Sequence, residues 1–542
     1  MRFKSVLTVL AAAAFASAVA QEGVLITDIA QRADETAWRP MDYETKDGIR
    51  GTLLYAAWGL PPLSQASLAL PVRGRYRIFL GLAGTRVPMS TAPFNILVRL
   101  GRDPAPVRIE ASAASDAGWW FQPVEVEWKT ADLQNDTLVV QKPYDSRSLL
   151  AWVRLVPVDG LETPPADGPR LIATNDAYRP ADSFAELCAP FMRFAGGPVK
   201  GVYHCVGNGP FAFAVPSRFG MLPAFGPDAR FENRYAADCA RSFAKLHREH
   251  PHLVDELADF AHSIGLEYHV SFRTGCALEL MEFSSPANRA EPGAAARGVC
   301  RSENWCRHWD GTPVSRPSYA KREVQEFFLS FYREMLTEKV DGINLIWIRA
   351  LPAMLFEPAF RERFRAAYGE DLAREDDPRV IPLRKEIMTG FLRRVREIAG
   401  RKRVSVVVPA RGSICESFGL DVARLAKEGI VDEFDVGDSL QTANHGESYD
   451  AIEFGYFREA LKGTKAVFLP FLWWCDGARV KAGLGKGASG AFLWDIGEKS
   501  WCDWRAFRSF FADGNARPSS SVHPLKTLDG FDMATYPWHV AY

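Results

Sequence analysis

The sequence has no marked excess of charge of either sign, and this absence excludes several classes of protein. It contains 65 Lys and Arg against 66 Asp and Glu, for a formal net charge of -1. No overall field would therefore attract nucleic acid or an anionic membrane surface. It also has no Cys-x-x-Cys pair that would suggest zinc, and no Gly-rich phosphate loop opens its second half. We expect no nucleic-acid partner, no cofactor and no metal.

Long apolar runs are absent beyond the N-terminus, so no later segment is expected to span a bilayer. Residues 1–20 combine a basic start (Arg2, Lys4), an apolar stretch and a small-residue ending at Ala20. This pattern predicts a secretory signal peptide that is cleaved after Ala20. The next residue is Gln21 and not Cys, so a lipid anchor there is not indicated. We expect a periplasmic or secreted protein.

Cysteines are few, and their number is odd. Nine are present, all between Cys188 and Cys502, so at least one is unpaired. In an oxidising compartment Cys300 and Cys306 are the best local candidates for a disulfide bridge. Buried free thiols are the alternative for the others.

Two regions of different character follow the predicted signal peptide. Residues 21–162 contain short β-prone runs separated by turn residues, which predicts an antiparallel β-sandwich. The runs are GTLLYAAW, GRYRIFLGLAG, FNILVRLG, VEVEWKTADL, DTLVVQK and LLAWVRLVPV. Residues 163–169 are rich in Pro, Gly and acidic side chains and are expected to form a linker.

Residues 170–513 alternate β-prone runs with amphipathic helical patterns, as a (β/α)8 TIM barrel does. The eight runs are RLIATND, KGVYHCVGN, LEYHVSFRTG, DGINLIWIR, RVSVVVPA, DEFDVGD, AVFLPFLWW and GAFLWDIG. A doubly wound open sheet is the alternative, but polar or aromatic residues follow nearly every run, which favours the barrel. Residues 514–542 form a C-terminal tail without a clear period, expected to pack against the barrel or to fray.

The segment 341–357 shows how one barrel strand could place a polar group at the active end. Asp341 enters the strand and is expected to cap or turn the chain at the amino end. Arg349 leaves at the carboxyl end, where active sites of barrels lie. Counting alternation back from Arg349, Trp347 and Leu345 would share its side, toward the substrate. The remaining positions, Asn344, Ile346 and Ile348, would face the helices.

A second arginine ends another predicted strand in the same way. Arg273 follows Ser271 and His269 at alternate positions, so we expect Arg273 and His269 to contact substrate. Two arginines at the carboxyl end would suit a substrate rich in hydroxyl or carboxylate groups. The alternative is that each pairs with a carboxylate of a neighbouring loop.

Acidic residues recur after successive predicted strands, and glycoside cleavage needs two carboxyl groups. The candidates are Glu357, Glu416, Asp438, Asp476 and Asp495. Glu357 stands between Phe and Pro, an apolar setting that would favour an acid if the carboxyl is buried. We predict Glu357, Glu416 and Asp495 as catalytic and Asp438 as substrate-binding. Solvated loop charges are the alternative, and the stereochemical outcome stays open.

Aromatic residues gather near the last two strands. Trp473 and Trp494 are predicted to bind sugar rings by stacking, and packing of the barrel rim is the alternative. Further tryptophans lie close in sequence, at Trp474, Trp501 and Trp504. His445 could carry a proton, but it has no neighbour at metal-ligand spacing.

Several segments of 170–510 resemble the family-ten-like glycosyl hydrolases, which are exported bacterial barrels with an accompanying β-domain. The resemblance rests on HLVDELADFAHSIGLEYHVSFRTG, DGINLIWIRALP, FRERFRAAYGEDL, GLDVARLAKEGIVDEFDVG and GASGAFLWDIG. It implies that Arg273, Arg349 and Asp495 are site residues and that the β-domain could bind glycans. Many relatives have Asp in the middle of the DGI strand, where this chain has Ile346.

Three functions follow as hypotheses. The first is a glycoside hydrolase acting on a poly- or oligosaccharide through a pair of carboxylates at the carboxyl end of the barrel. The second is a catalytically inactive carbohydrate-binding barrel, for which Ile346 is the main argument. The third is an exported polysaccharide lyase. The sequence does not indicate the oligomeric state.

Overall fold

The computed structural model describes most of the chain, with gaps that fall largely in loops. The described residues are 23–34, 38–56, 65–85, 94–112, 122–143, 146–158, 168–175, 180–181, 183–209, 211–212, 215–220, 234–275, 299, 301–348, 350–437, 447–473, 475–494, 504–513 and 520–528. The predicted signal peptide and linker lie mainly outside these ranges. No helix within them is long and apolar enough to cross a membrane.

The N-terminal region forms antiparallel strands in two groups. The first group contains β1 (Val24–Ile26), β3 (Arg39–Thr45), β4 (Arg50–Ala56), β6 (Arg73–Thr85), β9 (Gln122–Gln134) and β11 (Ser148–Pro157). The second contains β2 (Ala33–Asp34), β5 (Gln65–Ala69), β7 (Asn95–Leu100), β8 (Val107–Ser112) and β10 (Thr137–Gln141). All six predicted β-prone runs carry strands.

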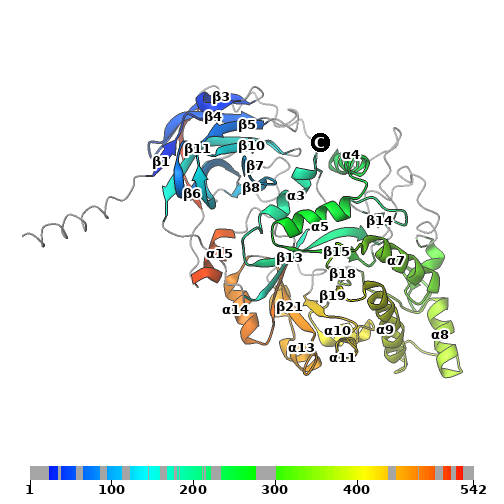
Figure 1. Ribbon diagram of the computed structural model, residues 1–542. Coiled ribbons are helices and arrows are strands. Elements are labelled where there is room, and N and C mark those ends of the chain that lie inside the picture. Colours follow the sequence, from blue (N-terminus) through cyan, green and yellow to red (C-terminus); the bar gives the residue numbers. More distant parts are fainter. Residues whose placement is uncertain are drawn as a thin grey trace, which may run out of the picture.

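One apolar core is shared by the two groups of strands. Ile78, Leu80 and Leu150 come from the first group, and Val98 and Leu138 come from the second. A short parallel pairing of β6 with β8 joins the groups at one corner. The predicted sandwich is therefore confirmed in part, as antiparallel sheets packed around a common core and lying beside the barrel (Figure 1).

The second region is a closed barrel of eight parallel strands. In order they are β12 (Arg170–Asn175), β13 (Val199–Asn208), β15 (Glu267–Arg273), β18 (Gly342–Ile346), β19 (Arg403–Val408), β20 (Glu433–Val436), β21 (Val467–Leu472) and β22 (Gly490–Leu493). The first strand pairs with both the second and the last, which closes the sheet. All eight predicted runs carry these strands, and closure excludes the open doubly wound sheet.

Helices follow the strands and cover the outside of the barrel (Figure 1). They include α3 (Phe184–Met192), α4 (Arg234–Glu249), α5 (Leu253–Ser263), α7 (Arg322–Met335), α8 (Pro358–Tyr368), α9 (Val380–Ala399), α10 (Gly412–Ser417), α11 (Val422–Lys427), α13 (Phe454–Ala460), α14 (Gly477–Gly485) and α15 (Trp504–Asp513). Local chemistry sets several boundaries. Pro358 starts α8, and Gly369 ends it at φ 77°, a conformation that glycine adopts without strain.

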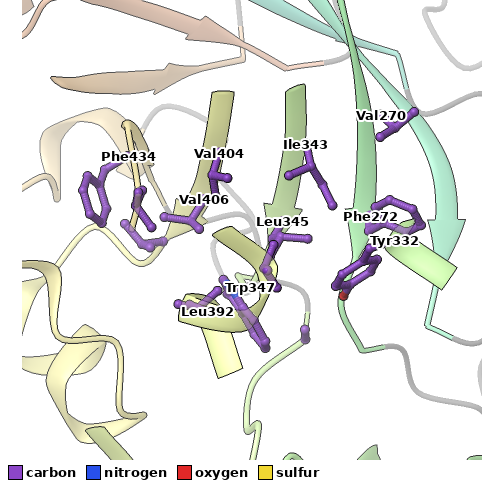
Figure 2. Packing of buried hydrophobic residues seen from close by; sticks show 14 of the residues in the cluster. Val270, Phe272, Tyr332, Ile343, Leu345, Trp347, Leu392, Val404, Val406 and Phe434 are labelled. Atoms are coloured by element: carbon purple, nitrogen blue, oxygen red, sulfur yellow. The ribbon is translucent and has the colours of Figure 1, made fainter. Parts of the chain in front are cut away.

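The side chains of β18 face the opposite way from the prediction. Ile343, Leu345 and Trp347 point toward the helices, where they pack with Tyr332 of α7 and Leu392 of α9 (Figure 2). The inward orientation predicted for Trp347 and Leu345 is therefore wrong. Both faces of this strand are buried, so its hydrophobic pattern does not distinguish them.

The inward positions of β18 are the polar Asn344 and the apolar Ile346. Asn344 donates to Ser405 of the neighbouring strand at 2.9 Å. Ile346 joins a cluster inside the barrel with Val407 and Phe471. Counting alternate positions back from Arg349 gave the wrong side because the strand ends at Ile346. The alternation does not continue to position 349, which therefore does not define the inward side.

The described part of the C-terminal tail does not pack against the barrel as expected. β23 (Ser520–Val522) pairs with β9, and β24 (Leu525–Leu528) pairs with β3. The chain therefore returns from the barrel to its own N-terminal sheet. Leu525 packs against an apolar cluster on that sheet, and this burial stabilises the pairing of the two strands with it.

The predicted bridge between Cys300 and Cys306 is not formed. Cys306 is a buried free thiol whose sulfur lies 3.6 Å from the carbonyl oxygen of Pro352. Burial and the nearby Glu357 raise the pKa of this thiol well above its usual value. Cys300 lies outside the described residues.

Candidate functional site at the carboxyl end of the barrel

The carboxyl ends of the eight strands meet at one end of the barrel, which we call the mouth. Trp473 and Trp494 follow β21 and β22 there, with ring centroids 6.2 Å apart. Phe471 supports both indoles from below, at 5.1 and 5.3 Å. Trp494 is buried, whereas Trp473 is partly exposed. The sequence-predicted pairing of these tryptophans at one place is therefore present in the structure.

Arg273 is the last residue of β15 and is also at the mouth. Its carbonyl accepts the N–H of Gly209 at 2.7 Å, which ties it to the end of β13. The next residue, Thr274, donates through its N–H and its hydroxyl to the carbonyl of Ile346, at 3.3 and 3.2 Å. The backbone that carries the Arg273 side chain is therefore held by hydrogen bonds to the strands on both sides.

A polar network fills the barrel below the mouth. Ser271 donates to Asn344 Oδ1 at 2.9 Å, and Asn344 Nδ2 donates to Ser405 Oγ at 2.9 Å and to Asp435 Oδ2 at 3.0 Å. Asp435 is fully buried. Burial and the neighbouring Glu433 raise its pKa well above the usual value, so the folded protein favours the protonated carboxyl.

Charged groups close the amino end of the barrel, which we call the floor. Glu433 accepts hydrogen bonds from Arg170 and Tyr203, and Arg403 lies 3.5 Å from it. Arg170 also donates to both carboxylate oxygens of Glu267, at 3.1 and 2.7 Å. Hydrogen bonds from His269 and Arg170, acting against desolvation, lower the pKa of Glu267. This network holds the strands together.

Sequence reasoning missed this network, although the sequence carries a signal for it. Acidic residues alternate in the strand EFDV, and single polar residues interrupt the neighbouring apolar strands. A depression of about 510 Å³ opens at the floor, lined by residues that include Lys200, His262 and Asp341. Asp341 accepts the N–H of Tyr268 and bonds His262, both at 2.7 Å, so its predicted structural role at the amino end is confirmed.

Glu357 is buried away from the barrel axis and holds a hairpin. This hairpin consists of β16 (Trp305–Arg307) and β17 (Pro313–Pro317), within the connection that follows β15. The carboxylate accepts the N–H of Arg307 at 3.2 Å, the N–H of Leu355 at 3.0 Å and the hydroxyl of Ser318. Glu357 is 1% exposed, and its described contacts hold the hairpin in place.

Glu416 and Asp476 lie on helices outside the strands. Glu416 of α10 accepts from Tyr456 at 3.3 Å and pairs with Lys385 of α9 at 3.2 Å. Asp476 caps α14 by accepting the N–H of Arg479 at 3.0 Å. These contacts do not bring Glu416 together with Glu357.

Two other predicted substrate-binding residues are buried away from the mouth. Trp347 has no exposed surface and packs against Tyr319 and Phe391, at 5.1 and 6.4 Å between ring centroids. It therefore cannot contact a substrate in the barrel, and the predicted substrate-binding role of Trp347 is wrong. His269 faces the barrel interior, but it lies lower, bonded to Glu267 at 3.0 Å and next to Tyr203.

Several predicted residues lie outside the described part of the chain: Arg349, Asp438, His445, Trp474, Asp495 and Trp501. Trp504 begins α15, but its side chain is not described. Of the predicted site residues, Trp473, Trp494 and Arg273 lie in the described part of the mouth.

The class defined by this topology is a (β/α)8-barrel protein with an N-terminal antiparallel β-domain. No family model matches the chain, and no curated protein matches it. Many solved structures are similar to it, and those named next are glycosidases.

One similar structure is a β-galactosidase from the psychrophilic Marinomonas ef1, at 12% identity and a TM-score of 0.38. The match covers 60% of this chain and 53% of that enzyme, so it spans about half of the enzyme's length. Another is the Podospora anserina GH26-CBM35 β-(1,4)-mannanase, at 10% identity, 90% and 96% coverage and a TM-score of 0.29. The α-galactosidase of Thermus thermophilus matches at 13% identity, 73% and 74% coverage and a TM-score of 0.26. These values do not define a family, and the fold assignment rests on the closed barrel itself.

Proposed function

We propose that the protein is an exported glycoside hydrolase that acts on a poly- or oligosaccharide at the mouth of the barrel. The observation that carries this proposal is the partly exposed indole of Trp473, which packs on the buried Trp494 at the same end of the barrel as Arg273. Indole faces pack against the flat apolar faces of sugar rings, and a guanidinium donates to hydroxyl or carboxylate oxygens. Barrel enzymes carry their active sites at this end.

Hydrolysis requires one carboxyl group as acid and another as nucleophile or base. We assign these roles to Asp438 and Asp495, each of which stands two positions beyond the end of an inner strand, β20 and β22. Glu357 and Glu416 were the first candidates from the sequence. Their hydrogen bonds and ion pairs favour structural roles for both.

A specific observation favours a second function, a barrel that binds carbohydrate without cleaving it. The inward side chains at the upper level of β18 and β19 are the apolar Ile346 and Val407. No carboxylate can therefore reach the mouth from these inward positions. In this alternative Trp473 and Arg273 would hold the glycan, and the loop carboxylates would not react.

The two functions are separated by assaying the full chain on a panel of polysaccharides for release of reducing ends. Asp438→Asn and Asp495→Asn should each lower the rate by about 10²-fold or more, because each removes an acid or base of the reaction. Glu357→Gln, Glu416→Gln and the control Asp371→Asn, an exposed residue paired with Arg365, should retain it. Glycan binding without any product from the unmodified protein would establish the second function. Unsaturated uronate products would instead identify a lyase.

A further inference from the structure

Three side chains on the N-terminal β-domain, outside the barrel, form a continuous array of hydrogen bonds. Ser521 Oγ lies 2.9 Å from Nε2 of His523, and Nδ1 of the same imidazole bonds Asp47 Oδ2. This is the order of groups in a Ser-His-Asp triad. We propose that Ser521, His523 and Asp47 form a second catalytic site, which hydrolyses esters of short acyl groups.

The fold assembles this array from segments that are 476 residues apart. β23 carries Ser521 and pairs with β9, and His523 donates its N–H to Pro123 at 2.8 Å. Two positions along a strand share one face, so Ser521 and His523 lie on the same side of the sheet. Lys46 donates its N–H to Pro524 at 2.8 Å, which brings the turn that carries Asp47 beside them.

Packing orients the imidazole between the hydroxyl and the carboxylate. His523 stands edge-on to Trp152, with ring centroids 5.2 Å apart and planes at 88°. Trp152 is itself fixed, because its indole covers Gly81 and its N–H donates to Glu125 at 3.0 Å. A side chain at position 81 would collide with this indole, since a Cβ there would lie 2.2 Å from it.

The charge of Asp47 fixes the tautomer that the reaction needs. Burial alone would raise the pKa of Asp47, but hydrogen bonds from Thr45 and His523 outweigh burial and lower it. An ionised carboxylate accepts the proton on Nδ1, which leaves Nε2 as the acceptor for the hydroxyl of Ser521. Ser521 is exposed and so is open to a substrate.

The backbone N–H that follows Ser521 is the candidate donor to an oxyanion. His523 bonds β9 through its N–H, so by the alternation of antiparallel pairing the N–H of Val522 points away from β9. Within the described residues no other strand pairs with β23. The partly exposed Arg154 donates to Glu125, the residue directly opposite Ser521, and so neutralises a carboxylate that would repel an oxyanion.

The reaction follows from these positions. Ser521 Oγ attacks the ester carbonyl carbon while its proton passes to Nε2 of His523. The bond from that carbon to the alcohol oxygen then breaks, and the alcohol leaves with the proton from Nε2. Water attacks the acyl group on Ser521 in the same way and releases the carboxylic acid. The open surface around Ser521 suits a small acyl group carried on a larger molecule.

The test uses the full chain with 4-nitrophenyl acetate and a fluorophosphonate probe. The unmodified protein should hydrolyse the ester and take up one probe, located at Ser521 by mass spectrometry. Ser521→Ala and His523→Gln should lower hydrolysis by about 10³-fold or more and abolish labelling. Thr527→Ala, an exposed hydroxyl on β24, should behave like the unmodified protein.

Structural effects are separated from catalysis by the melting temperature, which Ser521→Ala should leave unchanged. A protein that takes up no probe at Ser521 would overturn the proposal, even if every variant folds. Equal hydrolysis by Ser521→Ala and the unmodified protein would overturn it as well. Neither result depends on the barrel. The esterase proposal can therefore be wrong while the proposed glycoside hydrolase function is right.

Discussion

Replacing Asp435 with Asn should change how the stability of the protein depends on pH. The carboxyl is fully buried, it accepts a hydrogen bond from Asn344, and its Oδ1 atom has no hydrogen-bond partner among the described residues. Its pKa in the folded protein is raised well above the usual value by burial and by Glu433. The folded state therefore keeps a proton that the unfolded chain releases above about pH 4.

The sign of the effect follows from proton linkage. In the window between the unfolded and folded pKa values, the folded state binds more protons, so the free energy of unfolding falls as the pH rises. Asn does not titrate, so the variant does not lose this stability as the pH rises. The variant should therefore gain stability relative to the unmodified protein by about 1.4 kcal/mol per pH unit from about pH 4 upward, until the pH reaches the folded pKa.

Urea unfolding at a series of pH values, followed by tryptophan fluorescence, measures this difference. The amide N–H that replaces the unpartnered oxygen costs about 1–3 kcal/mol, but this cost is the same at every pH and leaves the slope intact. Asp371→Asn, at an exposed carboxyl paired with Arg365, should show no gain with rising pH. A stability difference for Asp435→Asn that does not change with pH would refute a raised pKa for Asp435.

Three further substitutions test the described contacts. Glu433→Gln should lower the free energy of unfolding by about 3–5 kcal/mol, because it breaks a buried ion pair with Arg170; a loss well below 1 kcal/mol in urea unfolding would contradict this. Gly342→Ala should cost about 1–3 kcal/mol, because the new Cβ would lie 2.3 Å from Nδ1 of His269; an unchanged melting temperature would count against this packing. Glu357→Ala should lower the free energy of unfolding by about 1–3 kcal/mol and speed proteolysis within residues 302–317. Glu357→Gln should speed this proteolysis less. Equal cleavage of the unmodified protein and both variants would show that Glu357 does not anchor the hairpin.

Much of the architecture could be predicted from the sequence, because the β-prone runs and the amphipathic helical repeats are both strong. Each predicted run of 170–513 carries a barrel strand, and helices such as α5, α7 and α9 form where amphipathic patterns lie between the runs. The pairing of β23 and β24 with the N-terminal sheet could not be predicted. Which sheet a short strand joins depends on contacts between residues far apart in sequence, and local pattern carries no information on these.

The candidate site was predicted less completely, for two physical reasons. A barrel strand buried on both faces does not reveal its inward side, and this reversed the assignment of Trp347 and Ile346. An apolar neighbourhood in sequence also does not show what a carboxylate bonds. Glu357 stands between Phe356 and Pro358, as a buried acid would, but its oxygens are occupied by the hairpin.

The most direct test of the central claim is a crystal structure of the Asp495→Asn variant with an oligosaccharide that the unmodified protein cleaves or binds. We expect a sugar ring against the partly exposed Trp473, with a hydroxyl or carboxylate oxygen within hydrogen-bonding distance of Arg273. A saccharide bound only in the depression at the floor, beside Lys200 and His262, would contradict the assignment of the mouth as the carbohydrate site.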